Sequence, residues 1–384
     1  MQIFSAAALK QAPFRFAGAL DFDQRKQGIS PRRLPDWTRS QVPGMMDVMV
    51  RMPAGVRLVF TTDSRRIGLT VMTTTMVTPP AAPRAVVFDL VADGVVTSQV
   101  FHGGNLIVLD PANPGEFELQ RGQAGTLWFE LPAGEKSIEL WLPHNAFVEV
   151  RDLQLDPGAT LGPAADGGHR WVHYGSSISH CMEAQTPTGT WPAVAARQAG
   201  LALIGLGLAG QCHLDPFVAR TIRDLDVELI SIKAGINLVN MDSMRERVFV
   251  PALHGFLDTI RERHAETPIV LISPIFCPAA EDHPGPTLAD ASGRFVTIRG
   301  AEDIRQGCLS LTRIRVLITE VVNARRAAGD LHLHYVDGLT LFGPADAGDL
   351  PDDLHPNAAG YARMGRRFAT SVLARLGYTS QGRV

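Results

Sequence analysis

Side chains that together can carry out acyl transfer stand in two short segments of the second half of the chain. Ser176 and Ser177 follow Gly175 in WVHYGSSISHC, and Asp352 and His355 are three residues apart in DDLHP. A serine hydroxyl is a weak nucleophile at neutral pH and needs a neighbouring base, usually a histidine that a carboxylate orients. An aspartate and a histidine at this spacing, where a loop meets a helix, can lie side by side. The two segments therefore predict a serine nucleophile and its base.

Two further segments carry groups that could stabilise the negative charge formed during acyl transfer. Gly210 lies in GLAGQCH and Asn237 in AGIN, each just after an apolar run. A tetrahedral intermediate needs hydrogen-bond donors for its oxyanion, and backbone N–H groups or an asparagine amide supply them. Each residue also has an alternative, purely structural interpretation. Gly210 could stand where the loop requires a positive φ, and the Asn237 side chain could hold its own loop in place. We expect the backbone N–H groups of Ser177 and Gly210 and the amide of Asn237 to form an oxyanion hole.

The elements that must position these groups follow from a pattern that begins near Gly168. Apolar runs at 171–175, 202–210, 227–235, 268–275 and 331–338 alternate with segments of helical period. This alternation predicts a three-layer α/β domain with a mostly parallel sheet. In such sheets ligands bind beyond the carboxyl ends of the strands, where the segments with Ser177, Gly210 and Asn237 lie. The segment with Asp352 and His355 stands separately, before the last helix.

The first 160 residues follow a different pattern. Short runs such as VRLVFTTD, AVVFDLVADG and SIELWLP alternate apolar and polar residues and end at turn-forming residues. This pattern predicts a β-sandwich or jelly roll. A chain of 384 residues also exceeds the ~250–300 residues that one core usually supports. We therefore expect an all-β domain over 1–165 and an α/β domain over 166–384, with the boundary in DPGATLGPAADGG.

The four candidate segments, in this order, resemble the conserved blocks of the SGNH (GDSL-type) hydrolase family. The segment GSSI matches the first block and makes Ser177 the counterpart of the nucleophile. Gly210 and Asn237 match the glycine and asparagine of the next two blocks, and Asp352 and His355 match the Asp-x-x-His block. The resemblance covers about the last 215 residues. It implies a flavodoxin-like α/β/α catalytic domain, and members of the family often carry a sandwich domain ahead of it.

Two positions depart from the family pattern. Ser176 replaces the aspartate that gives the GDSL type its name, and Leu238 replaces an aspartate common after the asparagine. Neither position has a triad or oxyanion role in the family. We expect the Ser176 hydroxyl to take over the local hydrogen bonds of the missing carboxylate.

The resemblance implies a carboxylic ester hydrolase: a serine esterase that removes a short, acetyl-like acyl group from a hydroxyl of a carbohydrate or similar small molecule. It implies neither a metal nor an organic cofactor. One alternative is an acyltransferase, in which an alcohol replaces water in the same chemistry. A second alternative is a binding protein without activity whose sandwich domain carries recognition.

Several other residues compete for functional roles. Asp353 and Asp337 are rival carboxylates for the base. His173, His180 and His213 surround the first two blocks and raise a metal hypothesis, although no metal-ligand spacing supports it; a polar pocket rim is the favoured interpretation.

Two features could shape substrate recognition. Trp128 and Trp141 lie in strand-like runs, where core packing is favoured over a sugar-stacking platform. The segment 277–303 lacks helical period and is either a lid or binding loop or a plain insertion.

Composition limits the class of partner. The formal net charge is −3, which predicts no nucleic-acid partner. The four cysteines (Cys181, Cys212, Cys277 and Cys308) are too scattered for a disulfide framework or a zinc finger, so we expect free thiols and a reducing compartment. No apolar run approaches the ~18 residues of a membrane span. The basic residues near the N-terminus follow the apolar run instead of preceding it. We expect a cytoplasmic protein with no membrane partner.

Overall fold

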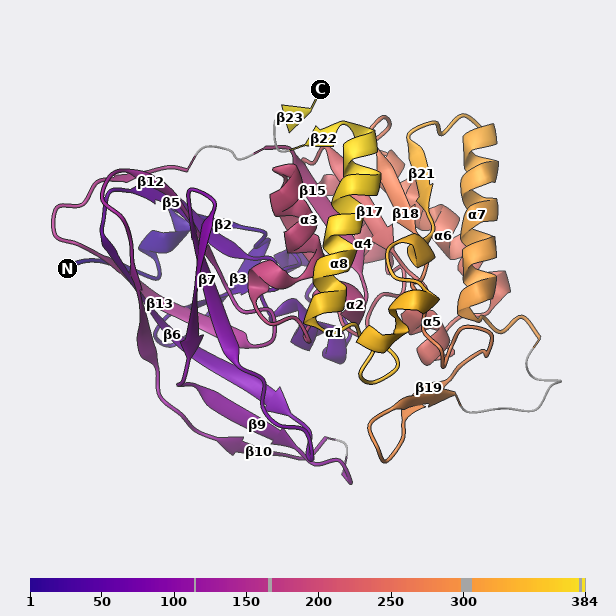
Figure 1. The fold of residues 1–384 in the computed structure, drawn as a ribbon, viewed down its shortest axis with the longest axis horizontal. Helices are drawn as coiled ribbons and strands as arrows, with labels where there is room; N and C mark the ends of the chain where they lie inside the picture. Colours follow the sequence, from indigo (N-terminus) through magenta and orange to yellow (C-terminus); the bar gives the residue numbers. More distant parts are fainter. Residues whose placement is uncertain (114, 165–167, 298–305, 380–381, 384) are drawn as a thin grey trace. The chain divides into compact units, whose positions relative to one another are not determined.

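The computed structural model describes residues 1–113, 115–164, 168–297, 306–379 and 382–383 (Figure 1). The chain forms two compact units that interleave along the sequence. One comprises Met1–Ser40, Asp47–Gly167 and Gln185–Thr188; the other comprises Gln41–Met46, Gly168–Ala184 and Gly189–Val384. The boundary predicted between residues 165 and 166 lies outside the described residues.

The first unit contains two mostly antiparallel sheets. The larger has the strand order β10-β9-β6-β13-β4-β3, with β1 beside β13 and β11 beside β6; the smaller has the order β14-β5-β12-β7-β8, with β2 beside β5. The larger sheet contains β1 (Gln2–Ser5), β3 (Asp21–Gln24), β4 (Ile29–Arg32), β6 (Arg66–Val77), β9 (Asn105–Leu109), β10 (Phe117–Gln120), β11 (Gly125–Glu130) and β13 (Phe147–Leu155). The smaller contains β2 (Arg15–Ala17), β5 (Arg57–Thr62), β7 (Val86–Ala92), β8 (Val95–Phe101), β12 (Lys136–Trp141) and β14 (Leu161–Gly162).

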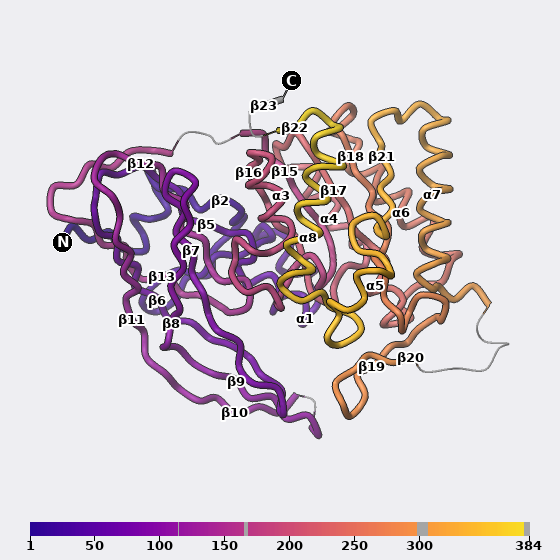
Figure 2. Tube along the Cα trace, viewed as in Figure 1, coloured from indigo at the N-terminus to yellow at the C-terminus, as the bar shows by residue number. Residues whose placement is uncertain are grey.

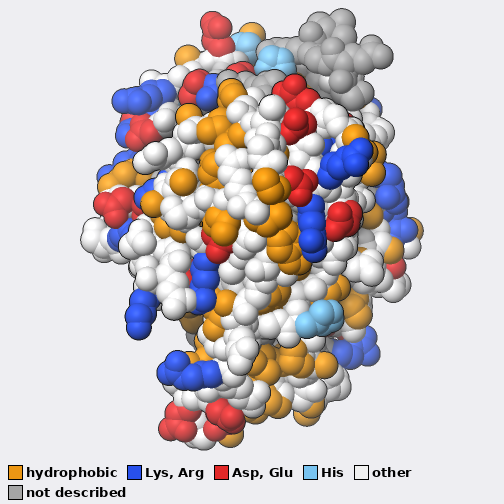
Figure 3. Space-filling model, turned by 90° about the vertical axis from the view of Figure 1, so that its left-hand side faces the viewer, with side chains coloured by type: hydrophobic (Ala, Val, Ile, Leu, Met, Phe, Trp, Pro, Cys, Tyr) orange, Lys and Arg blue, Asp and Glu red, His pale blue; other side chains and the backbone are white. Residues whose placement is uncertain are grey.

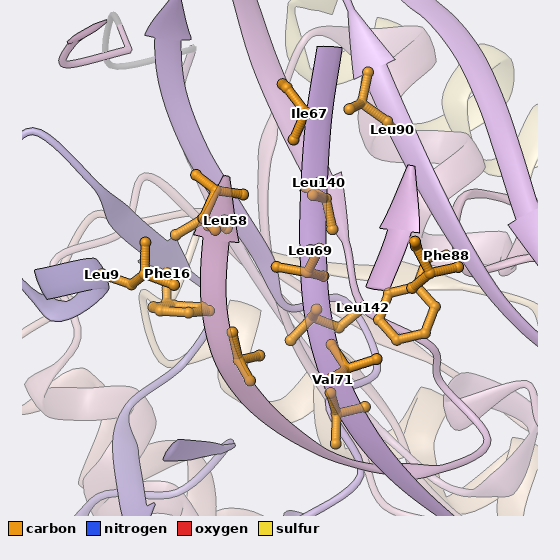
Figure 4. Packing of buried hydrophobic residues seen from close by; sticks show 14 of the residues in the cluster. Leu9, Phe16, Leu58, Ile67, Leu69, Val71, Phe88, Leu90, Leu140 and Leu142 are labelled. Atoms are coloured by element: carbon orange, nitrogen blue, oxygen red, sulfur yellow. The ribbon is translucent and has the colours of Figure 1, made fainter. Parts of the chain in front are cut away.

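Alternating residues of the two sheets form the core of this unit (Figure 4). Ile67, Leu69 and Val71 lie on one face of β6 and pack with Phe88 and Leu140 from the other sheet. Burying each such side chain contributes about 1.5–3 kcal/mol. The period of two in the sequence thus corresponds to one buried face per sheet.

The second unit is built on a five-stranded parallel sheet with the order β16-β15-β17-β18-β21. Its strands are β15 (Arg170–Gly175), β16 (Ala202–Gly207), β17 (Leu229–Lys233), β18 (Ile269–Ile272) and β21 (Leu333–Val336). Its helices are α2 (Ser177–His180), α3 (Trp191–Ala199), α4 (Pro216–Asp224), α5 (Ile236–Asn240), α6 (Glu246–Arg261), α7 (Leu311–Ala327) and α8 (Ala358–Phe368). A short helix, α1 (Gly44–Val50), lies earlier in the chain.

Helices cover both faces of this sheet. Trp171 of β15 stacks on Phe368 at the end of α8 and packs near Trp191 of α3, while Tyr174 of the same strand stacks on Phe256 of α6. One strand therefore contacts helices through both of its faces, which makes three layers. The predicted fold class, an α/β/α domain preceded by a β-sandwich, is confirmed.

The segment 277–303 contains a β-hairpin. Its strands are β19 (Thr287–Ala289) and β20 (Phe295–Thr297), labelled in Figure 2. Asp290 holds the turn by accepting hydrogen bonds from the backbone N–H groups of Ser292 and Arg294. Residues 298–303 of the predicted loop lie outside the described residues.

The charge of the surface and the length and hydropathy of the helices concern the kinds of partner that the sequence predicted. Acidic and basic side chains are interspersed with apolar ones on the face shown in Figure 3. None of the helices within the described part of the chain is long and apolar enough to cross a membrane.

Candidate active site

Ser177 is the first residue of α2, and only Ser176 separates it from the end of β15. The helix packs closely on the strand ends because glycines stand there. A Cβ on Gly175 would lie 2.3 Å from Ser179 Oγ, and one on Gly207 would lie 2.3 Å from the Ser179 carbonyl carbon. Glycine is required at both positions because a Cβ would clash with α2, and not because the backbone has a positive φ. The result is a partly exposed Ser177 at the carboxyl edge of the sheet.

Ser177, His355 and Asp352 form one hydrogen-bonded chain. His355 Nε2 lies 3.0 Å from Ser177 Oγ, and His355 Nδ1 lies 2.7 Å from Asp352 Oδ2. The structure thus brings together two residues 178 positions apart in the sequence. All three side chains stand in the order that a serine nucleophile, its base and an orienting carboxylate require.

The contacts of Asp352 fix the protonation of His355. Asp352 Oδ1 accepts hydrogen bonds from the backbone N–H groups of Leu354 and His355 at 3.0 and 2.7 Å. Burial would raise the pKa of Asp352, but the hydrogen bond and charge of His355, together with these backbone donors, lower the pKa below its ordinary value of 3.8. An ionised carboxylate only accepts, so Nδ1 of His355 carries the proton and Nε2 accepts from the Ser177 hydroxyl.

The two rival carboxylates have other partners. Asp353 accepts a hydrogen bond from Arg294 Nε at 2.5 Å. Asp337 accepts from the backbone N–H of Leu339 at 3.0 Å and caps a short 3-10 helix. Of the three candidates, Asp352 is the one bonded to the imidazole.

The predicted oxyanion donors follow the two strands that flank β15. Gly175 at the end of β15 pairs in register with Gly207 of β16 and Lys233 of β17, so the three strand ends are adjacent. Asn237, on α5 after β17, is 3% exposed, and its Oδ1 accepts from the backbone N–H of Cys212 at 3.0 Å. A backbone N–H can only donate, so the carbonyl oxygen of the amide must face it and the NH₂ group is left free to donate.

Gly210 lies in the loop that carries Cys212. Its φ is +70°, a conformation that L side chains rarely adopt. Its carbonyl oxygen accepts from His213 Nε2 at 3.2 Å, and the other ring nitrogen of His213 accepts from the Ser243 hydroxyl at 2.9 Å. His213 therefore anchors this loop, a role that the sequence did not reveal, although the histidine stood in the matching block.

The expectation for Ser176 was wrong. Its side chain is 1% exposed, and within the described part of the chain its Oγ has no hydrogen-bond partner. Its backbone oxygen instead accepts from the N–H groups of Ser179 and His180 and so starts α2. The other departure from the family pattern, Leu238, is fully buried.

The pocket-rim interpretation was also wrong for His173 and His180, because both are buried. Trp171 Nε1 donates to Ser231 Oγ at 2.8 Å. His173 is hydrogen-bonded through Nδ1 to Ser231 Oγ at 2.7 Å and through Nε2 to Ser179 Oγ at 2.8 Å. Burial, with a smaller effect of Lys233, lowers the pKa of His173 to about 3, so it is neutral.

The metal hypothesis, the two tryptophans and the cysteines are the remaining candidates from the sequence. Across the residues that the structure describes, there is no group of three or more His, Cys, Asp or Glu side chains arranged to hold a metal ion. Trp141 is buried, while Trp128 lies over Gly68 with the Arg66 guanidinium 4.1 Å from its ring centroid. Both rings are thus engaged in packing. All four cysteines are free thiols.

Phe295 of the β19–β20 hairpin is a residue near the triad that the sequence did not single out. Its ring meets that of His355 edge to face, with the centroids 5.8 Å apart, and its backbone N–H donates to the Asp352 carbonyl at 3.2 Å. No local motif marks this contact, because it joins residues about 60 positions apart.

The fold and these contacts define a serine acyl-transfer site on a flavodoxin-like sheet. Residues 169–278 match the model of the GDSL-like Lipase/Acylhydrolase family, a stretch that contains Ser177, Gly210 and Asn237. This match confirms, over that stretch, the resemblance to SGNH/GDSL-type esterases and acyltransferases that the sequence indicated.

Solved structures share the two-unit arrangement. A salicylyl-acyltransferase, SsfX3, from a tetracycline biosynthetic pathway is 29% identical over 98% of this chain and 97% of that chain, with a TM-score of 0.81. A family two carbohydrate esterase from Clostridium thermocellum, in complex with cellohexaose, is 15% identical over 95% and 99% of the two chains, with a TM-score of 0.61. At that identity the likeness shows the fold alone. A comparison with curated proteins gave no match.

Proposed function

We propose that this protein is a serine esterase that hydrolyses a short-chain, acetyl-like O-acyl ester of a carbohydrate or similar small molecule. The observation that carries the proposal is the hydrogen-bonded chain from Ser177 through His355 to Asp352 at the carboxyl edge of the sheet. The residues 166–384 would form the catalytic domain, and the residues 1–165 an accessory sandwich domain.

The geometry leads to a two-step reaction. Ser177 Oγ attacks the ester carbonyl while His355 Nε2 takes the hydroxyl proton, and Asp352 stabilises the imidazolium that forms. The N–H groups of Ser177 and Gly210 and the amide of Asn237 hold the oxyanion. The C–O bond to the alcohol then breaks, and His355 returns its proton to the departing oxygen. Water, deprotonated by His355, attacks the acyl-enzyme, releases the acid and restores Ser177.

An acyltransferase is the second candidate. The likeness to the salicylyl-acyltransferase extends over both units and supports it. The acyl-enzyme on Ser177 would be the same, and an alcohol bound beside His355 would replace water as the acceptor. A binding protein without activity is disfavoured, because all three triad side chains are bonded in sequence.

The proposed location is the cytoplasm, and the proposed partner is a small-molecule or carbohydrate ester. The four free thiols support a reducing compartment. The net charge of −3 supports a partner other than nucleic acid.

The test compares wild type with Ser177→Ala on p-nitrophenyl esters of increasing chain length and on acetylated sugars. Free acid and transferred acyl group are measured in the same reaction with candidate alcohols present. We expect Ser177→Ala to abolish both. The control is Ser176→Ala, the same chemical change one residue earlier, which we expect to keep turnover within about threefold of wild type. Unchanged turnover in Ser177→Ala would overturn both catalytic proposals.

A further inference from the structure

The β19–β20 hairpin and the loop after β18 line an open hollow of about 360 Å³ beside the triad. Its lining comprises Pro278, Ala279, His283, Arg294, Phe295, Val296, Thr297 and Asp353. All of these residues belong to the second unit. The volume is at the lower end of the ~300–1,000 Å³ typical of ligand pockets, which suits one ring better than a polymer segment.

Two lining residues connect the hollow to the triad. The Phe295 ring packs against His355, and its backbone N–H bonds the Asp352 carbonyl. Arg294 forms an ion pair with Asp353, next to the triad aspartate. The Thr297 hydroxyl bonds the Ala279 carbonyl and ties the hairpin to the loop after β18. The wall of the hollow is therefore attached directly to the loop that carries the base.

The position of the hollow decides which half of an ester it would meet. During acyl transfer the carbonyl carbon lies at Ser177 Oγ, and its oxygen points to the donors at Gly210 and Asn237. The alcohol oxygen must lie at His355 Nε2, because this atom gives it a proton as it leaves or takes a proton from it as it attacks. Neither the triad side chains nor the oxyanion donors belong to the lining of the hollow. The hollow adjoins the base side of the site, because its lining residue Phe295 packs on His355 and its lining residue Asp353 follows Asp352.

We propose that this hollow is the alcohol subsite, and that it takes a hydroxylated six-membered ring. The inference rests on the proposed function of the triad and deepens it. The apolar edge of such a ring would lie on Phe295, Val296 and Pro278. Its hydroxyl groups would meet the polar rim of His283, Arg294 and Asp353. A mixed lining of this kind fits an alcohol that is both ring-shaped and polar better than an alkyl chain.

Filling the hollow tests the proposal. Val296 is 44% exposed, and Val296→Trp would place an indole over the hollow without replacing a side chain that touches the triad. The control is Ala291→Trp, which adds the same side chain at the exposed hairpin turn, outside the lining. Val296→Phe is the smaller replacement should the indole prevent folding, which a thermal melt reveals.

Two series of substrates vary the alcohol and the acyl group of the ester independently. Acetates of ethanol, cyclohexanol and methyl glucoside vary the alcohol, and ethyl acetate, propionate and butyrate vary the acyl group. We expect wild type to prefer the glucoside acetate to cyclohexyl acetate. We expect Val296→Trp to lower the kcat/KM ratio of glucoside to ethyl acetate at least about tenfold, a typical loss when a fitting group is excluded. The order of the three ethyl esters should stay as in wild type, and Ala291→Trp should keep all ratios.

Two outcomes overturn the proposal while leaving the triad intact: an unchanged alcohol ratio, or a shift in acyl-chain order, either of them with turnover that still depends on Ser177. A wild-type preference for cyclohexyl acetate would overturn the hydroxylated ring. Turnover that survives in Ser177→Ala would instead overturn the proposed function itself, so the two failures are distinguishable.

Discussion

Replacing Asp352 with asparagine should invert the proton arrangement of the triad while keeping its shape. In the structure Asp352 Oδ1 accepts from the backbone N–H groups of Leu354 and His355, and Oδ2 faces His355 Nδ1. In Asp352→Asn the amide oxygen must take the Oδ1 position, because two N–H donors point at it. The NH₂ group then faces Nδ1 and forces that nitrogen to accept. The proton moves to Nε2, which can no longer accept the Ser177 proton.

The expected magnitude follows from the loss of general-base catalysis. A triad held in the wrong tautomer is slower by about 10⁴-fold, which corresponds to about 5.5 kcal/mol of transition-state stabilisation. The backbone hydrogen bonds that shape the loop are retained, so the folded structure should persist. The loss should therefore appear in kcat, with the melting temperature within a few degrees of wild type.

The assay is hydrolysis of p-nitrophenyl acetate at neutral pH, with a thermal melt of each protein. Asp337→Asn is the matched control, because Asp337 caps a short helix through one oxygen that the amide reproduces. We expect it to keep activity within about threefold of wild type. Retention of more than a tenth of wild-type kcat by folded Asp352→Asn would refute the assignment of the orienting carboxylate.

Three further predictions concern neighbouring groups. Asn237→Ala removes one oxyanion donor and should lower kcat about 10²–10³-fold, measured with p-nitrophenyl acetate; a loss below threefold would exclude the amide from the oxyanion hole. Ser176→Ala deletes a buried hydroxyl without a described partner, so urea unfolding should show a free energy of unfolding unchanged or raised by up to about 1 kcal/mol, and a clear loss would reveal a missed contact. Burial lowers the pKa of His173 from 6.5 to about 3. The unfolded chain therefore binds one more proton between these values, and stability should fall by up to about 1.4 kcal/mol per unit as pH decreases below 6.5. His173→Gln should remove that slope in urea unfolding at pH 7, 6 and 5, and an equal slope in both proteins would contradict a neutral buried imidazole.

The sequence predicted those parts of the site that topology alone brings together. Parallel strands place their carboxyl ends at one edge, so the strand pattern alone groups Ser177, Gly210 and Asn237. Asp352 and His355 were predicted from their spacing and their place before a helix. The change of hydrophobic period along the chain predicted both architectures. Strands that alternate apolar and polar residues bury one face, as in a two-layer sandwich, whereas apolar strands between helical segments belong to a three-layer α/β domain.

Contacts that depend on exact side-chain reach were not predictable in the same way. Ser176 was expected to replace a carboxylate, yet whether a hydroxyl reaches a partner depends on distances of tenths of an ångström. His173 stood near the nucleophile in sequence but alternates to a buried face of β15, where it bonds Ser231 and Ser179. The role of His213 depends on how the chain turns after Gly210, which a single histidine in a loop does not signal.

The hairpin shows why base orientation and alcohol selection should be coupled in this protein. The loop that carries Asp352 and His355 is bound through its backbone at two points: Phe295 donates to the Asp352 carbonyl, and the Cys277 thiol donates to the Asp353 carbonyl at 3.3 Å. Both donors come from the segment that lines or adjoins the hollow. An alcohol that moves the hairpin would therefore also move the imidazole that must accept its proton. The oxyanion side is held separately, by Cys212 on Asn237, so selection of the acyl group can vary without disturbing the base.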